Sequence, residues 1–263
     1  MLYTARSAEF RTEEGVLKAK ATCEKYGLEG LVVIGGDGSF RGAADLSAHG
    51  ILCVGLPGTI DNDIACTDYT IGYDTAMNTA MELMDKLSDT SQSHYRCSVV
   101  EVMGRGAGYI ALNTGVASGA LEIITKEKPY DLDKIAKKMM EFKARGKQNF
   151  IIVVAENIGH SEEICKLIQE KTGIESRATI LGHVQRGGSP TVRDRVAATE
   201  MGYYAVELLE QGIGNRVVGM QGGKVVDFDI QEALSMTKPY DEKLHQIACL
   251  LYTSDAADEG LGV

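Results

Sequence analysis

The chain of 263 residues has little proline and no long apolar run, and each shortage excludes certain classes of protein. Four prolines are too few for a proline-rich linker or a proline-rich disordered segment. No apolar run approaches the roughly 20 residues that cross a bilayer, and the first residues show no signal-peptide pattern. The sequence therefore predicts a cytoplasmic protein without a membrane partner.

Clustered cysteines and an excess of basic residues are also missing. The six cysteines form no Cys-x-x-Cys pair and no zinc spacing, so we expect buried or free thiols in a reducing compartment. Lys and Arg number 27 against 37 Asp and Glu, which gives a formal net charge of −10. An acidic chain binds nucleic acid poorly, so we expect no nucleic-acid partner and look for anion sites only in local basic clusters.

The chain does contain 30 glycines and a repeated alternation of apolar and amphipathic segments. Short runs rich in Val and Ile predict buried strands at residues 30–36, 51–55, 97–104, 121–125, 149–156 and 177–182, with shorter strands at 216–221 and 224–228. Helical patterns occupy residues 13–26, 40–48, 73–88, 107–118, 131–145, 161–172 and 191–211. This alternation predicts an α/β fold with mainly parallel strands, and a second lobe that begins near residue 72.

Polar turns follow several of these strands, at the sheet edge where α/β proteins bind ligands. The first is Gly35–Ser39, with the sequence GGDGS. Its glycines let backbone N–H groups approach a phosphate, and Asp37 could bind Mg²⁺. A tight turn with a capping Asp is an equally good interpretation of this motif alone, and several kinase superfamilies use such a turn.

The second polar turn is PGTIDND, from Pro57 to Asp63. Thr59, Asp61 and Asp63 place a hydroxyl and two carboxylates within five residues, which predicts a general base beside a metal or hydroxyl ligand. In an extended segment the two aspartates would share a face. An Asx-rich surface turn is the alternative.

The third and fourth turns each carry an arginine. Met103-Gly104-Arg105-Gly106 places the planar fork of Arg105 at a strand end, where it suits phosphoryl oxygens; a surface salt bridge is the alternative. Residues 182–190, GHVQRGGSP, place His183 three residues before Arg186, which suits a second phosphate; a structural histidine is the alternative. Together the four turns predict phosphoryl transfer from a nucleotide to a phosphorylated alcohol.

These four motifs, in this order and at these separations, resemble the bacterial type of ATP-dependent 6-phosphofructokinase over about residues 1–248. The resemblance implies a glycolytic kinase that transfers a phosphoryl group from ATP to fructose 6-phosphate with Mg²⁺, as an allosteric homotetramer. It implies two Rossmann-like α/β/α lobes with mainly parallel sheets, the first strand or strands being missing. The lobes would be an ATP-binding remainder at residues 1–71 and a mainly sugar-phosphate lobe at 72–240, from which C-terminal segments could return to the first.

The resemblance also implies roles for residues that match the family's motifs. Asp61 would take the proton of the sugar 1-hydroxyl, flanked by Thr59 and Asp63, and Arg105 would neutralise the transferred phosphoryl group. Asp37 would bind Mg²⁺, while the ATP phosphates and ATP itself would be contacted by Gly36, Gly38, Ser39 and Arg6. The sugar phosphate would be held by Met103, Gly104, Glu156, His183 and Arg186, and by Arg96 and Arg177 lent across a subunit interface.

Glycine at positions 38 and 58 favours ATP over pyrophosphate, because the pyrophosphate-using relatives resemble GGDDS and PKTIDND there. Three positions depart from the family's effector site, namely Ser88, Leu121 and Asn149. The family begins with a strand and a phosphate-binding turn that this chain lacks, because Met1 already corresponds to a later part of the family's sequence. Residues 249–263 have no family counterpart. We interpret the late start as a truncation and residues 249–263 as a non-native tail; a divergent solvated tail rich in Asp and Ala is the alternative.

Two other functions stay open from the sequence. A lipid or NAD kinase shares the GGDG turn, but PGTIDND and the two arginine motifs count against it. A catalytically impaired chain that binds sugar phosphate without turnover is the second alternative.

Overall fold

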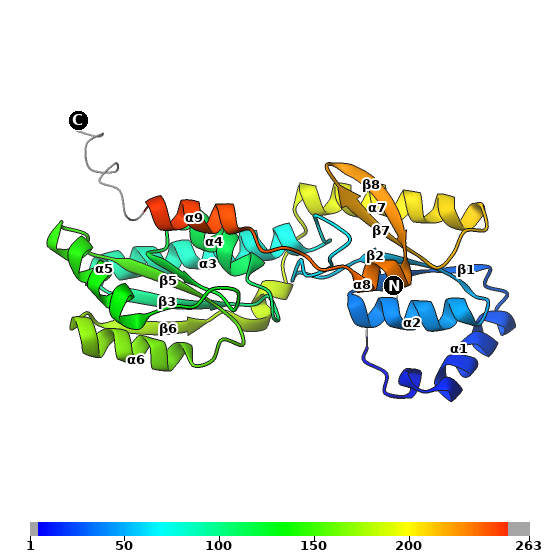
Figure 1. Ribbon diagram of the computed structural model, residues 1–263, viewed down its shortest axis with the longest axis horizontal. Helices are drawn as coiled ribbons and strands as arrows, with labels where there is room; N and C mark the ends of the chain where they lie inside the picture. Colours follow the sequence, from blue (N-terminus) through cyan, green and yellow to red (C-terminus); the bar gives the residue numbers. More distant parts are fainter. Residues whose placement is uncertain (1–4, 252–263) are drawn as a thin grey trace. The chain divides into compact units, whose positions relative to one another are not determined.

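The computed structural model describes residues 5–251, and none of the helices within that range is long and apolar enough to cross a bilayer. The chain forms two compact units (Figure 1). Unit 1 comprises the residues up to Thr59, Ile64–Gly72 and Pro190–Lys238. Unit 2 comprises Ile60–Asp63, Tyr73–Ser189 and the residues from Pro239 onward. The assignment of one lobe to ATP and the other to fructose 6-phosphate stays a prediction.

Unit 1 is built on a four-stranded sheet in the order β1-β2-β7-β8. Its strands are β1 (Gly30–Gly35), β2 (Leu52–Pro57), β7 (Arg216–Gln221) and β8 (Lys224–Asp229). The first three run parallel and β8 is antiparallel to β7. Gly35 pairs with Pro57, so the carboxyl ends of β1 and β2 lie side by side.

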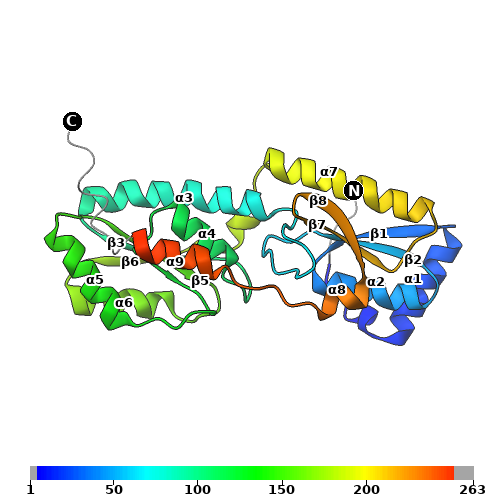
Figure 2. The same cartoon turned by 45° about the horizontal axis from the view of Figure 1, so that its top comes forward.

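Helices cover both faces of this sheet, as Figures 1 and 2 show. Helix α7 (Val192–Glu210) lies on one face, and α1 (Glu13–Lys25), α2 (Asp37–Ala48) and α8 (Ile230–Ser235) lie on the other. A 3-10 helix, η1 (Glu9–Arg11), precedes α1. The core between the layers contains Phe40, which is 1% exposed, and Val217, which is fully buried.

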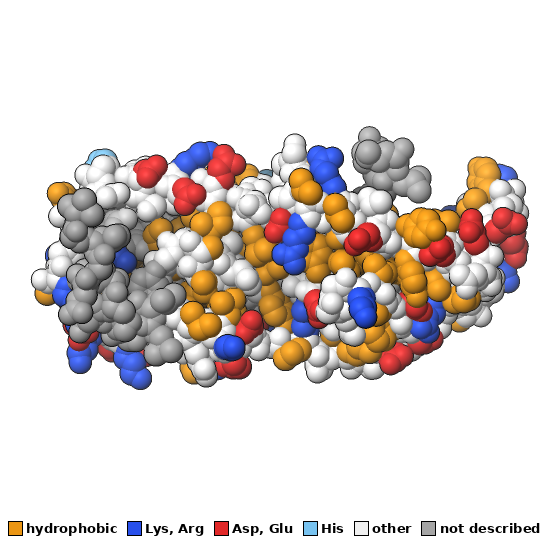
Figure 3. Space-filling view, turned by 90° about the horizontal axis from the view of Figure 1, so that it is seen from above, with side chains coloured by type: hydrophobic (Ala, Val, Ile, Leu, Met, Phe, Trp, Pro, Cys, Tyr) orange, Lys and Arg blue, Asp and Glu red, His pale blue; other side chains and the backbone are white. Residues whose placement is uncertain are grey.

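The outer face of α7 carries exposed hydrophobic side chains. Figure 3 shows hydrophobic side chains gathered over the α7 side of unit 1. On α7 itself they follow helical spacing on one stripe, separate from the buried side chains of the same helix, and comprise Val192, Val196, Tyr203 and Val206.

Unit 2 is built on a fully parallel sheet in the order β4-β5-β3-β6. Its strands are β3 (Cys97–Val102), β4 (Glu122–Ile124), β5 (Phe150–Ala155) and β6 (Ser176–Ile180). Helices α3 (Tyr73–His94) and α4 (Tyr109–Ala117) cover one face, and α5 (Leu132–Ala144) and α6 (Ser161–Thr172) cover the other (Figure 2). Helix α9 (Glu242–Leu251) packs against α4, and a second 3-10 helix, η2 (Gly182–Arg186), follows β6.

The expected α/β fold and all the expected strands and helices are confirmed, with differences at their ends. Helix α3 continues to His94 instead of residue 88. Helix α2 begins at Asp37 instead of residue 40, so Asp37, Gly38 and Ser39 form the first turn of a helix. The two 3-10 helices, α8 and α9 were not expected. Of the expected tail, residues 249–251 end α9, and the rest lies outside the described residues.

Candidate functional site

Two of the predicted turns meet at the carboxyl end of the sheet in unit 1. Gly36 is the N-cap of α2, and its predicted phosphate-binding neighbours open that helix. The backbone N–H of Gly58 donates to the carbonyl oxygen of Gly35 at 3.0 Å, and a Cβ built on Gly36 would lie 4.0 Å from the Cβ of Thr59. The parallel pairing of β1 and β2 therefore brings the GGDGS and PGT segments together.

Gly38 and Gly58 lie in different surroundings. A Cβ added at Gly38 would meet no described atom within 4 Å, so there is open space beside this residue of the first turn of α2. A Cβ added at Gly58 would lie 2.7 Å from Cγ2 of Ile34. Packing alone therefore explains the glycine at position 58, whereas nothing in the described packing explains the glycine at position 38.

Lys238 is a charged residue near Cys66 that the sequence did not identify. Both charges act on Cys66, which is fully buried. Burial raises the pKa of the Cys66 thiol to about 11, the charge of Lys238 lowers it and that of Asp37 raises it. The thiol therefore keeps its proton at neutral pH, and the charges of Asp37 and Lys238 act on it in opposite directions. A lysine far along the sequence gives no local signal of this proximity.

Arg6 lies in the segment before η1 and is exposed. It forms no hydrogen bond or ion pair with another residue of the described range. Its predicted contact with ATP stays a prediction.

In unit 2, Asp61 and Asp63 lie in a turn. Asn62 between them has φ of +51° and is 6% exposed. The backbone is therefore not extended at Asn62, so the condition under which both carboxylates would share a face is not met. Asp63 instead lies beside Arg105, whose Nη1 is 3.6 Å from Oδ2 of Asp63.

Arg105 belongs to a sharp turn directly after β3. Gly104 has φ of +146° and Arg105 has φ of +61°. A Cβ at Gly104 would lie 2.6 Å from the carbonyl oxygen of Ala107, so only glycine fits there without movement of the backbone. The side chain of Arg105 remains 65% exposed, while that of Asp63 is 19% exposed.

Side chains from two other loops hold this turn. The Glu156 carboxylate accepts hydrogen bonds from the N–H groups of Gly104, at 3.2 Å, and of Arg105. Asn157 donates its side-chain amide to the carbonyl oxygen of Arg105. Oε1 of Gln185 accepts from the N–H of Met103 at 2.8 Å. Asn157 and Gln185 were not identified from the sequence; a polar residue after a buried strand was the available signal for Asn157.

The predicted sugar-phosphate residues of unit 2 differ in exposure. Met103 is 8% exposed and lies in the interior, whereas His183 and Arg186 are exposed on η2. Glu156 is half-buried and is engaged with the Gly104–Arg105 turn, and its predicted contact with the sugar stays a prediction. These residues all follow the carboxyl ends of β3, β5 and β6.

Arg96 and Arg177 lie at the opposite end of the same sheet. Arg96 precedes β3, and Arg177 is the second residue of β6. Both pair with Glu175: Nε of Arg96 lies 2.8 Å from it and Nη2 of Arg177 lies 3.0 Å from it. Since both strands run parallel, these arginines are separated from His183 and Arg186 by the length of a strand.

Tyr109, at the start of α4, is excluded as a base. Burial raises the pKa of Tyr109 to about 12, and the negative charges of Glu127 and Asp63 add to the rise. Its hydroxyl donates to the carbonyl oxygen of Pro239 at 3.1 Å. The phenol therefore keeps its proton at neutral pH and cannot accept another from a substrate.

A divalent cation bound by this chain would have few side-chain ligands. Within residues 5–251 no group of three or more His, Cys, Asp or Glu side chains could hold a metal ion. Mg²⁺ commonly uses one or two carboxylates and takes its other ligands from water and substrate phosphates. Asp37, at the start of α2, fits that kind of site together with a bound nucleotide.

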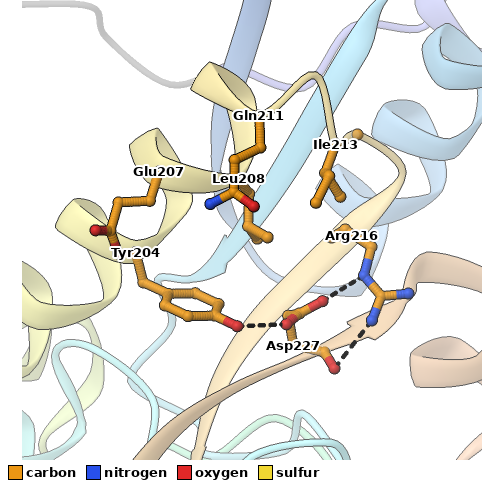
Figure 4. A pocket seen from close by; sticks show the side chains of 8 residues that line it. Tyr204, Glu207, Leu208, Gln211, Ile213, Arg216 and Asp227 are labelled. Atoms are coloured by element: carbon orange, nitrogen blue, oxygen red, sulfur yellow. Dashed lines mark hydrogen bonds and ion pairs between the residues drawn. The ribbon is translucent and has the colours of Figure 1, made fainter.

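A cavity of about 520 Å³ lies away from the predicted turns (Figure 4). It is bounded by α7 and by the first residue of β7, Arg216, at the amino end of that strand. Asp227 accepts hydrogen bonds from Tyr204, at 2.7 Å, and from Arg216, so these three side chains bond to one another. Ligands of open α/β sheets bind at carboxyl ends, and the cavity is therefore not the candidate site.

The three positions predicted to depart from an effector site, Ser88, Leu121 and Asn149, differ in burial. Leu121 is 1% exposed. Nδ2 of Asn149 donates to Oγ of Ser88 at 3.4 Å, so these two residues meet each other.

A family model described as phosphofructokinase matches residues 1–209, which is well over half of the chain. The chain belongs to the phosphofructokinase family. Its curated relatives include the ATP-dependent 6-phosphofructokinase of Clostridium botulinum, 56% identical over 251 residues, which are 95% of this chain and 79% of the relative. The protein of the same name from Clostridium tetani is 55% identical over 248 residues, which are 94% of this chain and 78% of that one.

Solved structures of phosphofructokinases share the fold. The enzyme from Saccharomyces cerevisiae matches with a TM-score of 0.83 and 32% identity, over 95% of this chain and 39% of its own chain. The pyrophosphate-dependent enzyme from Marinobacter aquaeolei matches with a TM-score of 0.78 and 20% identity, over 90% of this chain and 66% of its own. The second likeness extends to the fold alone.

The turn after β3 predicts a contrast between two neighbouring glycines. Gly104→Ala should lower the free energy of unfolding by about 1–3 kcal/mol, because its backbone is left-handed and its Cβ meets a carbonyl oxygen. Gly106→Ala is the matched control, since a Cβ there meets no described atom within 4 Å. Urea unfolding measures both variants. Equal stability of the two would contradict the strained geometry assigned to Gly104.

Proposed function

We propose that the chain transfers the γ-phosphoryl group of ATP to the 1-hydroxyl of D-fructose 6-phosphate, giving fructose 1,6-bisphosphate and ADP in glycolysis. The observation that carries the proposal is the turn after β3, which presents an exposed Arg105 with its guanidinium 3.6 Å from the Asp63 carboxylate. An arginine fork beside an acidic turn suits the charge that develops in phosphoryl transfer. Relatives named ATP-dependent 6-phosphofructokinase, 55–56% identical, support the substrates.

The acceptor half of the reaction belongs to unit 2. Asp61 takes the proton of the sugar 1-hydroxyl, and Asp63 keeps Arg105 directed at the transferred phosphoryl group. The sugar is held by Gly104 and Glu156, and by the small part of Met103 that reaches the surface. His183 and Arg186 bind its 6-phosphate, and their exposure on η2 supports contact with a ligand.

The donor half belongs to unit 1. The backbone at Gly36, Gly38 and Ser39 faces the ATP phosphates at the first turn of α2, where helix N–H groups favour anions. Thr59 adjoins this turn and helps to position the phosphates, and Arg6 contacts the nucleotide. Asp37 would hold Mg²⁺, which supplies positive charge against the phosphate oxygens when bound.

The arginines at the far end of the unit 2 sheet support a homo-oligomer. Arg96 and Arg177 lie a strand length from His183 and Arg186, so within one chain they do not reach the 6-phosphate site. In our proposal a second copy of the chain brings them to that phosphate, and the assembly is a cytoplasmic homotetramer. Their shared partner Glu175 keeps both side chains ordered beside one another.

A direct assay tests the phosphoryl donor. Purified protein with fructose 6-phosphate and Mg²⁺ should produce fructose 1,6-bisphosphate with ATP and not with pyrophosphate, measured by coupling to aldolase. Faster turnover with pyrophosphate would contradict the donor. Binding of fructose 6-phosphate in calorimetry, without turnover with either donor, would instead support the alternative of a chain that binds sugar phosphate alone.

A substitution at Gly38 tests the choice of phosphoryl donor further. Gly38→Asp has room for its Cβ and adds a negative charge at a helix N-terminus, so it should fold as well as the parent. The added carboxylate repels the nucleotide phosphates, and the KM for ATP should rise at least about tenfold. Gly38→Ala is the control and should keep a KM close to that of the parent.

The proposed base is tested by Asp61→Asn. The change keeps the size of the side chain and removes its ability to accept a proton. General base catalysis contributes ~10²–10⁴-fold, so kcat should fall by about that factor while the KM for fructose 6-phosphate changes little. Steady-state kinetics measure both. Retention of most of the parental kcat would assign the proton transfer to another residue.

The shared site is tested by co-expression of two impaired variants. Asp61→Asn lacks the base, and Arg177→Ala lacks an arginine that the proposal assigns to the site of another copy. A site in a mixed oligomer is complete when Asp61 comes from an Arg177→Ala chain and Arg177 comes from an Asp61→Asn chain. Random mixing gives this pairing at about a quarter of the sites, so about a quarter of the parental activity should return. Activity that stays at the mean of the two separate variants would show that each chain completes its own site.

A further inference from the structure

Gln185 is the only residue of η2 (Gly182–Arg186) that is buried, at 1% exposure. The exposed His183 and Arg186 lie on either side of it along the chain. A five-residue 3-10 helix has few internal hydrogen bonds, so its orientation depends on whatever it buries. The side chain of Gln185 therefore sets how η2 sits on the rest of unit 2.

The partner of that side chain is the turn that carries Arg105. Oε1 of Gln185 accepts a hydrogen bond from the N–H of Met103 at 2.8 Å, although the two residues lie 82 positions apart. The next two N–H groups, of Gly104 and Arg105, donate to Glu156. Three successive backbone N–H groups thus end on side chains, and the hydrogen bond of Gln185 links this turn to η2.

The side-chain amide of Gln185 lowers the stability of the fold at this position, because only one of its two polar atoms is hydrogen-bonded to a described residue. Its Nε2 is buried and has no hydrogen-bond partner among the described residues. A buried donor without a partner costs free energy, and proteins retain such costs mainly at functional sites. An oxygen at this place, and not simply a well-packed side chain, is what the structure maintains.

We propose that Gln185 is a positioning residue that fixes the Arg105 turn relative to His183 and Arg186. The inference rests on the proposed function for the roles of those three residues. One sugar bisphosphate carries two phosphoryl groups at a fixed separation, and the group at each end needs its own cationic clamp. The Gln185–Met103 hydrogen bond holds the two clamps at one spacing.

Three substitutions test the role of the oxygen. Gln185→Leu removes the acceptor at similar volume, and Gln185→Asn withdraws it by one methylene. Gln185→Glu keeps an acceptor oxygen and serves as the conservative variant. The matched control is Gln169→Leu, because Oε1 of Gln169 likewise accepts a backbone N–H, from Ser176 at 2.9 Å, at the other end of β6.

Loss of the acceptor should act on the sugar phosphate and not on the nucleotide. A misplacement of about 1 Å can cost ~10²-fold, so Gln185→Leu and Gln185→Asn should raise the KM for fructose 6-phosphate and lower kcat, each by at least about tenfold. The KM for ATP should stay within about twofold. Gln185→Glu should recover most of the loss, and Gln169→Leu should show parental constants.

Two outcomes would overturn the proposal. The first is a Gln185→Leu or Gln185→Asn protein with a lower melting temperature and parental kcat and KM values, which would make the residue purely structural. The second is a Gln185→Glu protein as impaired as Gln185→Leu, which would show that the acceptor oxygen is not the operative group.

Hydrogen exchange separates this inference from the proposed function. The backbone amides of residues 103–105 should exchange faster in Gln185→Leu than in the parent or in Gln169→Leu, whether or not the parent turns over. An inactive parent with that exchange pattern would refute the proposed function and leave the hydrogen bond in place. Unchanged exchange in Gln185→Leu would refute the positioning role even in an active parent.

Discussion

The left-handed turn after β3 is the constraint on which the candidate site depends. Gly104, at φ of +146°, reverses the chain so tightly that a Cβ would touch the carbonyl oxygen of Ala107. This reversal exposes Arg105 and directs three consecutive N–H groups at side chains from other loops. A backbone in this conformation is costly, and the bonds from Glu156, Asn157 and Gln185 keep it in place.

The parallel sheet of unit 2 has two ends with different chemistry. The carboxyl ends of β3, β5 and β6 collect Arg105, Glu156 and η2, while the amino ends of β3 and β6 collect Arg96 and Arg177 around Glu175. Parallel strands enforce this separation, because residues at corresponding ends must lie on the same edge. One chain therefore carries arginines at both ends of this sheet, each beside a carboxylate.

The patterns of the sequence were sufficient for most of the fold. Runs of Val and Ile such as 150–155 identified the strands because a strand buried on both faces reads as a continuous apolar run. The turns after those strands identified Asp37, Asp61 and Arg105 as candidates, because ligand-binding residues of α/β proteins follow strand ends. The start of α2 at Asp37 was misplaced, since Gly38 and Ser39 have weak helical propensity and only the N-cap at Gly36 fixes the boundary.

By itself the sequence determined the fold class, the order of the motifs and the residue types available for chemistry, because these follow from local hydrophobic periodicity and short-range spacing. Tertiary structure alone decided which of those residues meet. Asn62 interrupts the extended backbone between Asp61 and Asp63, Glu175 gathers two distant arginines, and Gln185 reaches Met103 across 82 positions. Such contacts depend on sheet order and on single backbone conformations, and neither leaves a local pattern in the chain.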